Sequence, residues 1–95
     1  MITLEIYNSI NKNYELKSTP LIQYNFTDNE WMPVSILFKK RLNNIDIERL
    51  KHANEIIIST DIEKFKIVVR SLDINDYKKK LIITPNHALL LEQSI

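Results

Sequence analysis

The chain contains no glycine, although glycine makes up about 7% of an average globular protein. Backbone positions with φ above zero must therefore be filled by other residues, and we expect asparagine or aspartate there. Loops that cradle phosphates and turns that expose a catalytic serine both depend on glycine for close backbone approach. The sequence thus excludes the nucleotide-binding loops and the serine-nucleophile motif that define many enzyme classes.

Cysteine is also absent, so the chain has no disulfide framework, no thiolate nucleophile and no cysteine-ligated zinc. Small secreted domains often depend on disulfides, and their absence favours a reducing compartment. No apolar stretch approaches the roughly 20 residues that span a membrane, and Glu5 interrupts the apolar start of the chain. We expect a soluble, cytoplasmic protein without a signal peptide or a membrane partner.

Strong net charge is lacking as well. The 13 basic and 12 acidic residues leave a formal net charge of +1, which gives no long-range attraction to nucleic acid or anionic lipid. Isoleucine, lysine and asparagine are abundant, and their AT-rich codons point to a bacterial or mobile-element source. The apolar share of 44% is typical of a folded protein, and we expect residues 1–95 to form a single domain.

The residue pattern predicts an α+β domain with a mainly antiparallel sheet of about five to seven strands and two helices. Apolar and polar residues alternate from Ile2 to Tyr7, as in a half-buried strand. The β-branched run at 55–59 predicts a central strand that is buried on both faces. Strands are expected at residues 2–7, 14–17, 21–26, 31–39, 55–59, 79–84 and 88–93, the last being either a strand or a helical turn.

Two helices are expected between these strands. Asn44 would cap a helix over residues 45–53, whose first turn carries acidic residues suited to the helix dipole. A second helix is expected after a cap at Thr60 or Asp61, where Phe65 and Leu72 belong to an apolar face with helical spacing. Residues 65–72 also alternate as a strand would, and we favour the helix.

The segment of residues 31–42 fits two structures. Val34 and Phe38 fall on one helical face, which would make the segment a helix. If the segment is a strand, Pro33 confines it to a sheet edge or a bulge. We favour a strand that forms a hairpin with residues 21–26.

Histidine and carboxylate side chains offer no recognisable catalytic or metal-binding set. His52 follows Glu48 by four residues, which predicts an exposed pair on one helix face. His87 comes after an expected strand without a partnered nucleophile, which indicates a turn residue. The segment 73–76 lacks the central glycine and the closing glutamate of a calcium loop. We therefore expect a protein that is not an enzyme and that binds no metal or cofactor.

Two basic clusters stand out, Lys39–Arg41 and Lys78–Lys80. In a nucleic-acid-binding protein such clusters contact phosphates, and the adjacent Phe38 and Tyr77 would stack on bases. Otherwise, the second cluster protects an edge strand against pairing with another chain, and the first is a solvated element end. The alternative function is a small nucleic-acid-binding protein that uses Lys39, Lys40, Arg41, Lys78, Lys79 and Lys80.

Acidic side chains and the single tryptophan favour a protein partner. Trp31 follows Asp28 and Glu30 at the expected hairpin tip, where an exposed tryptophan would anchor an interface; the other interpretation places Trp31 in the core. The carboxylates of Asp28, Glu30, Asp73 and Asp76 would mimic phosphates toward a nuclease toxin. Because no catalytic set is present, we expect first a bacterial immunity or antitoxin-type protein, a toxin inhibitor that occludes the active site of its partner.

Overall fold

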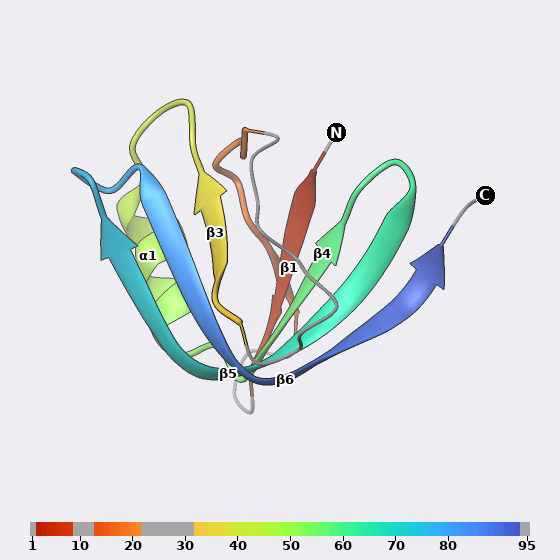
Figure 1. The fold of residues 1–95 in the computed structure, drawn as a ribbon. Coiled ribbons are helices and arrows are strands. Elements are labelled where there is room, and N and C mark those ends of the chain that lie inside the picture. Colours follow the sequence, from red (N-terminus) through yellow and green to blue (C-terminus); the bar gives the residue numbers. More distant parts are fainter. Residues whose placement is uncertain (1, 9–12, 22–31, 94–95) are drawn as a thin grey trace.

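The computed structural model describes residues 2–8, 13–21 and 32–93 (Figure 1). Within these ranges the chain forms six β-strands and one α-helix. In chain order the elements are β1 (Thr3–Tyr7), β2 (Tyr14–Glu15), β3 (Val34–Leu37), α1 (Asn44–Lys51), β4 (Glu55–Ser59), β5 (Glu63–Asn75) and β6 (Lys80–Gln93). The helix lies between the third and fourth strands in sequence, where the pattern at 45–53 predicts it.

The six strands of the described ranges form one sheet, in which every neighbouring pair is antiparallel. The strand order is β2-β1-β4-β5-β6-β3. This confirms the predicted α+β class with an antiparallel sheet of five to seven strands. β3 lies at one edge of the sheet, a position that suits a strand preceded by Pro33. The strand interpretation is therefore correct for Val34–Leu37, while most of its expected hairpin partner, residues 22–26, lies outside the described residues.

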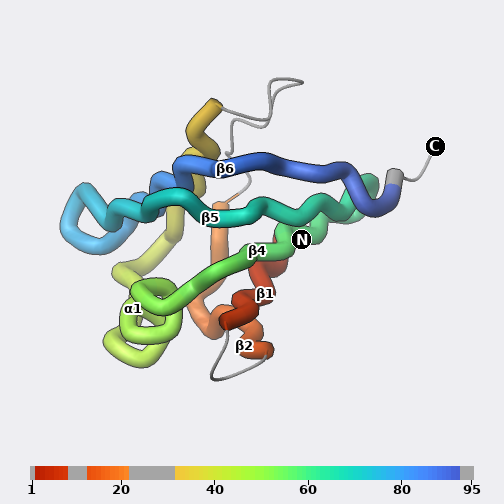
Figure 2. The backbone as a smooth tube through the Cα atoms, turned by 90° about the horizontal axis from the view of Figure 1, so that it is seen from below, coloured from red at the N-terminus to blue at the C-terminus, as the bar shows by residue number. Residues whose placement is uncertain are grey.

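β5 and β6 are the longest strands described, and they form a bent hairpin that runs across the whole molecule (Figures 1 and 2). The register between them shifts at Lys64/Phe65 and on both sides of Val69. β-Bulges of this kind bend a strand and increase its twist. The first half of β5 pairs with β4, whereas the first half of β6 pairs with β3. The sheet therefore curls into two walls. One wall contains β4 and the first half of β5, and the other contains β3 and the first half of β6.

The inward face of the curled sheet carries the apolar core. In β1, Leu4 and Ile6 are fully buried, while Thr3, Glu5 and Tyr7 are half-exposed, which confirms the predicted alternation. The buried apolar residues are Ile2, Leu4, Ile6, Leu16, Val34, Ile36, Phe38, Leu42, Leu50, Ile56, Ile58, Phe65, Ile67, Leu81, Ile83 and Ala88. They come from five of the strands, the helix and the segments between, so one continuous core holds the described elements together.

The second predicted helix is wrong, because residues 60–72 make a turn and then enter β5. The Thr60 hydroxyl, which suits a helix cap, instead accepts hydrogen bonds from the backbone N–H groups of Ile62 and Glu63 at 3.3 and 3.1 Å. The backbone N–H of Thr60 donates to the Glu63 carbonyl at 2.8 Å, which closes a tight turn between β4 and β5. β-Branched residues then favour a strand, and Phe65 is fully buried on its inward face.

Several smaller predictions also differ from the structure. The cap of α1 is Asn43, one residue earlier than expected, and its Oδ1 accepts from the backbone N–H of Asp46 at 2.8 Å. β4 is central, but only alternate residues are buried, so its predicted burial on both faces is wrong. β6 continues through Pro85, whose partner Val69 lies at the register shift, so a bulge accommodates this proline. His87 therefore lies in a strand and not in a turn.

The turn between β5 and β6 contains all the positive φ angles among the described residues: Asp76 (52°), Tyr77 (55°) and Lys78 (67°). Aspartate is one of the two residue types expected at such positions, whereas tyrosine and lysine are not. A left-handed conformation costs a residue with a Cβ atom about 1–2 kcal/mol. The backbone of this turn is therefore strained. Glycine would relieve the strain, but the chain contains none.

We expect Lys78→Gly to raise the free energy of unfolding by about 0.5–1 kcal/mol, because glycine adopts a positive φ without a steric penalty. Lys79→Gly is the matched control, since Lys79 has no positive φ and glycine there should cost about 0.5–1 kcal/mol. The free energies of unfolding of both variants and of the wild type can be compared by urea titration monitored by circular dichroism. Equal destabilisation by the two substitutions would show that Lys78 is not strained.

Candidate functional site

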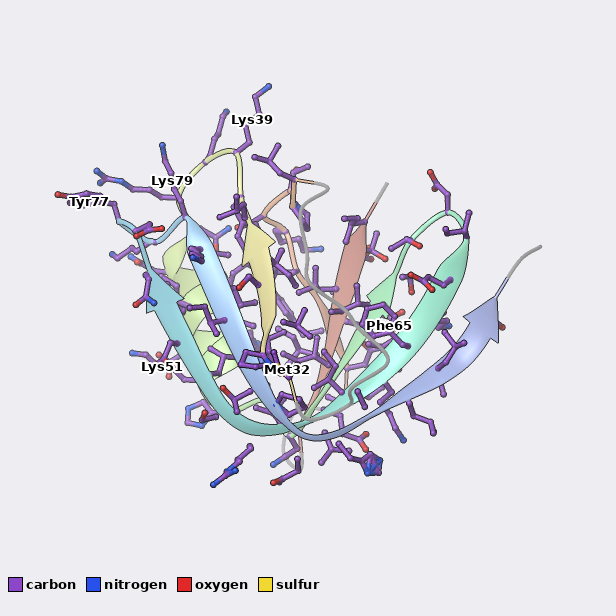
Figure 3. All side chains as sticks on the ribbon, viewed as in Figure 1. Met32, Lys39, Lys51, Phe65, Tyr77 and Lys79 are labelled. Atoms are coloured by element: carbon purple, nitrogen blue, oxygen red, sulfur yellow. The ribbon has the colours of Figure 1, made fainter. Side chains whose placement is uncertain are left out.

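The two basic clusters lie side by side at one end of the molecule (Figure 3). One cluster follows β3, and the other spans the end of the β5–β6 turn and the first residue of β6. The backbone N–H of Leu42 donates to the Lys78 carbonyl at 2.7 Å, and that of Phe38 donates to the Lys79 carbonyl at 2.8 Å. The three residues between Phe38 and Leu42 form the first cluster, so these hydrogen bonds hold it against the turn.

A surface pocket extends the first cluster toward the segment that follows β2. Its lining residues are Lys17, Ser18, Thr19, Lys39, Lys40, Arg41 and Asn43. Lys17 adds a cation to the pocket, and Asn43 marks the N-terminal end of α1, where the helix dipole is positive. We call the cations of the pocket and the turn the basic patch, which consists of Lys17, Lys39, Lys40, Arg41, Lys78, Lys79 and Lys80.

The basic patch is open to solvent, and none of its side chains forms an ion pair with a described residue. Lys80 is half-buried, and the other patch residues are exposed. The ion pairs found in the described ranges lie elsewhere: Lys66 with Glu55 at 3.5 Å, and His52 with Glu48 at 3.4 Å, the latter as their spacing predicts. Exposed cations without acidic partners repel one another, and an anion bound between them would relieve that repulsion.

A buried carboxylate fixes the wall of the pocket that carries Lys17. Asp46, in the first turn of α1, is fully buried. Its oxygens accept hydrogen bonds from the Tyr14 hydroxyl at 2.6 Å, the Lys17 backbone N–H at 3.1 Å, and the Ser18 backbone N–H and hydroxyl at 2.7 and 2.6 Å. These bonds tie residues 14–18 to the start of α1, so Lys17 is held beside the first cluster.

The same network sets the protonation of its two acidic groups. Burial raises the pKa of the Asp46 carboxyl, but the hydrogen bonds it accepts outweigh burial and leave its pKa below the ordinary value. Asp46 is therefore ionised at neutral pH, with its oxygens occupied by these donors. Burial and the hydrogen bond to Asp46 raise the pKa of Tyr14 to about 12, and the Arg49 guanidinium lies 5.2 Å from the centre of the Tyr14 ring.

Of the residues predicted for a protein interface, two lie in the described part of the chain. Asp28, Glu30 and Trp31 lie outside the described residues. Asp73 is exposed near the end of β5, and Asp76 is exposed in the strained turn. Asp76 therefore adds a carboxylate next to the basic patch.

The two aromatic residues beside the clusters have opposite environments. Phe38 is 3% exposed and belongs to the core, so its predicted role in base stacking is wrong. Tyr77 is 84% exposed and projects from the same end of the molecule as Lys39 and Lys79 (Figure 3). Tyr77 is thus an aromatic side chain at the basic patch that a ligand can reach.

The described ranges contain no group of three or more histidine, cysteine or acidic residues placed to hold a metal ion. No helix in these ranges has the length and apolar character needed to cross a membrane. No known protein family, curated protein or solved structure matches this chain.

Proposed function

We propose that the chain binds nucleic acid and that the basic patch contacts the phosphates. The observation that carries this proposal is the meeting of Lys39–Arg41 with Lys78–Lys80, which are far apart in sequence and joined by backbone hydrogen bonds. In nucleic-acid-binding proteins, clustered lysine and arginine side chains provide the affinity that does not depend on sequence.

The charge distribution supports binding despite the small net charge. The patch holds seven of the 13 basic residues of the chain. Its cations therefore outnumber the carboxylates of Asp76 and Asp46 beside it, and the field of a polyanion would attract this end of the molecule. Affinity from such a patch is local and falls steeply as salt is added.

The extent of the patch favours a polymer over a single phosphate. Its cations come from three segments: the stretch that follows β2, the loop after β3, and the β5–β6 turn with the first residue of β6. A free phosphate or a single phosphate monoester would contact only the cations of the pocket. A strand of nucleic acid carries a phosphate at every nucleotide and would engage the pocket and the turn together.

Salt dependence tests this proposal. The association constant for a labelled 12-nucleotide DNA strand can be measured by fluorescence anisotropy at 50–200 mM NaCl. The logarithm of this constant should fall with the logarithm of the salt concentration with a slope of about −5, because each of the seven cations that contacts a single strand contributes about −0.7. Absence of binding at 50 mM NaCl, or a slope near zero, would contradict the proposed function.

A matched pair of double variants locates the binding surface. Lys39→Gln combined with Lys40→Gln should reduce the magnitude of the slope by about 1.4, since two contacts are lost. The control combines Lys51→Gln with Arg70→Gln, which removes the same charge from a second pocket at the C-terminal end of α1. Figure 3 shows Lys51 well away from Lys39 and Lys79. If the slope fell equally in both variants, the overall charge of the protein, and not a defined surface, would determine binding.

The toxin-inhibitor function stays a prediction. Three of its five named residues, Asp28, Glu30 and Trp31, lie outside the described residues. One observation favours a protein contact of some kind. Four large apolar residues are exposed near the end of the hairpin opposite the patch, namely Ile62, Leu89, Leu90 and Leu91.

A further inference from the structure

Tyr77 occupies a position for which its side chain is poorly suited. It lies between Asp76 and Lys78 in a run of three positive φ angles, and asparagine would adopt this conformation at lower cost. Its ring gains little from burial, because 84% of the residue is exposed. Strained residues that contribute no packing often have a role in binding.

The rest of the fold holds this turn in place. The backbone N–H of Lys79 donates to the carbonyls of Asn75 and Asp76, both at 3.1 Å, which closes the turn. The carbonyls of Lys78 and Lys79 accept hydrogen bonds from the segment that carries the first cluster. Tyr77 is therefore presented on a fixed backbone and not on a loose loop, at the end of the molecule that holds the patch (Figure 3).

We propose that Tyr77 stacks on an unpaired base, so that the chain prefers single-stranded nucleic acid to a duplex. This inference rests on the proposed function, because the lysines beside the ring would hold the phosphates that bring a base within reach. The face of an aromatic ring stacks on any base, and stacking adds affinity without reading sequence. In a duplex the base faces are covered by neighbouring base pairs, so the ring would find no free face.

Three probes of equal length separate stacking from charge. They are a labelled thymidine 12-mer, a 12-mer of abasic sites with the same phosphates, and a 12-base-pair duplex. Wild-type protein should bind the thymidine strand about tenfold more tightly than the abasic strand, which is a typical gain for stacking on one base. The duplex should not bind more tightly than the abasic strand when the affinity of each probe is divided by its number of phosphates.

Two substitutions of Tyr77 assign the effect to its ring. Tyr77→Asn keeps a residue that tolerates a positive φ and should lower affinity for the thymidine strand about tenfold, with no change for the abasic strand. Tyr77→Phe keeps the ring and should retain wild-type affinity for both. Circular dichroism and thermal unfolding verify that each variant is folded.

The possible outcomes separate the two proposals. Equal wild-type affinity for the thymidine and abasic strands, unchanged by Tyr77→Asn, would overturn stacking and leave phosphate binding intact. Loss of affinity for the abasic strand in Tyr77→Asn would also overturn stacking, because the turn and its lysines would then have moved. Failure to bind any of the three probes would overturn the proposed function itself.

Discussion

Glutamine at all six positions of the two basic clusters should abolish measurable binding to a single strand, a loss of about ten thousandfold at 100 mM salt. The variant combines Lys39→Gln, Lys40→Gln, Arg41→Gln, Lys78→Gln, Lys79→Gln and Lys80→Gln. Each contact with a single-strand phosphate releases about 0.7 of a counterion, which corresponds to about fivefold in affinity at this salt concentration. Six such contacts multiply to the expected loss.

The two halves of this variant test whether the clusters act as one surface. Replacing only Lys39–Arg41 or only Lys78–Lys80 should each weaken binding by about a hundredfold at 100 mM salt. Because the clusters sit on adjacent segments, one strand should contact both, and the two losses should multiply. If one triple variant lost all affinity and the other kept the wild-type value, the patch would not be a single binding surface.

The same variants should remain folded. The six side chains are exposed or, for Lys80, half-buried, and no ion pair among the described residues involves them. The hydrogen bonds that join the clusters use backbone atoms, which glutamine leaves in place. Removal of like charges from one surface should leave thermal stability unchanged or slightly raised, and a large fall in stability would instead assign these lysines a structural role.

Local pattern was sufficient to predict several elements of this fold. Alternation from Ile2 to Tyr7 predicted β1, because strand side chains alternate regardless of which strand pairs with them. The isoleucine run predicted β4 through the preference of β-branched residues for strands, although not its burial. The acidic first turn gave α1 to within one residue at its start. The second helix failed because Thr60 has the same chemistry in a turn as at a helix cap, and only pairing with β4 and β6 decides between them.

The candidate site could be predicted only in part. Each basic cluster can be recognised in the sequence as three consecutive cations. That the two clusters lie side by side depends on hydrogen bonds between Leu42 and Lys78 and between Phe38 and Lys79. The contact of Phe38 continues the pairing of β3 with β6, in which Leu37 lies opposite Lys80, and no local pattern encodes which strands pair. Lys17 was missed because it is an isolated cation in the sequence, and long-range contacts, among them the hydrogen bond to the Asp46 carboxylate, bring it to the patch.

Asp46→Asn should lower the free energy of unfolding by about 3 kcal/mol at pH 7, the largest effect on stability expected from an isosteric change in this network. The carboxylate is fully buried and accepts from the Tyr14 hydroxyl, the Ser18 hydroxyl and two backbone N–H groups. An asparagine of the same shape presents one oxygen and one NH₂ group, so some of these donors would face another donor. No cavity forms, and the loss therefore reports the hydrogen bonds.

The pH dependence gives this loss a characteristic shape. The pKa of Asp46 is lowered in the folded protein, so its ionisation stabilises the fold above its unfolded pKa of about 4, and this contribution is lost as pH falls through the folded pKa. The difference between wild type and Asp46→Asn in urea unfolding should therefore be constant from pH 5 to 7 and shrink below pH 4. A difference that stayed constant to pH 2 would show that folding does not lower the pKa of this carboxyl.

Tyr14→Phe completes the test, because it removes one donor to Asp46 and keeps the ring beneath Arg49. Alone it should cost about 1.5 kcal/mol, the value of a hydrogen bond to a charged group. In the Asp46→Asn background it should cost much less, because the partner is already altered, and the difference between the two measures their coupling.

Asp73→Asn, at an exposed position on β5, is the matched control and should change stability by less than about 0.5 kcal/mol. Additive losses from Tyr14→Phe and Asp46→Asn would mean that their 2.6 Å contact contributes nothing, and the attachment of residues 14–18 to α1 would then rest on the other donors alone.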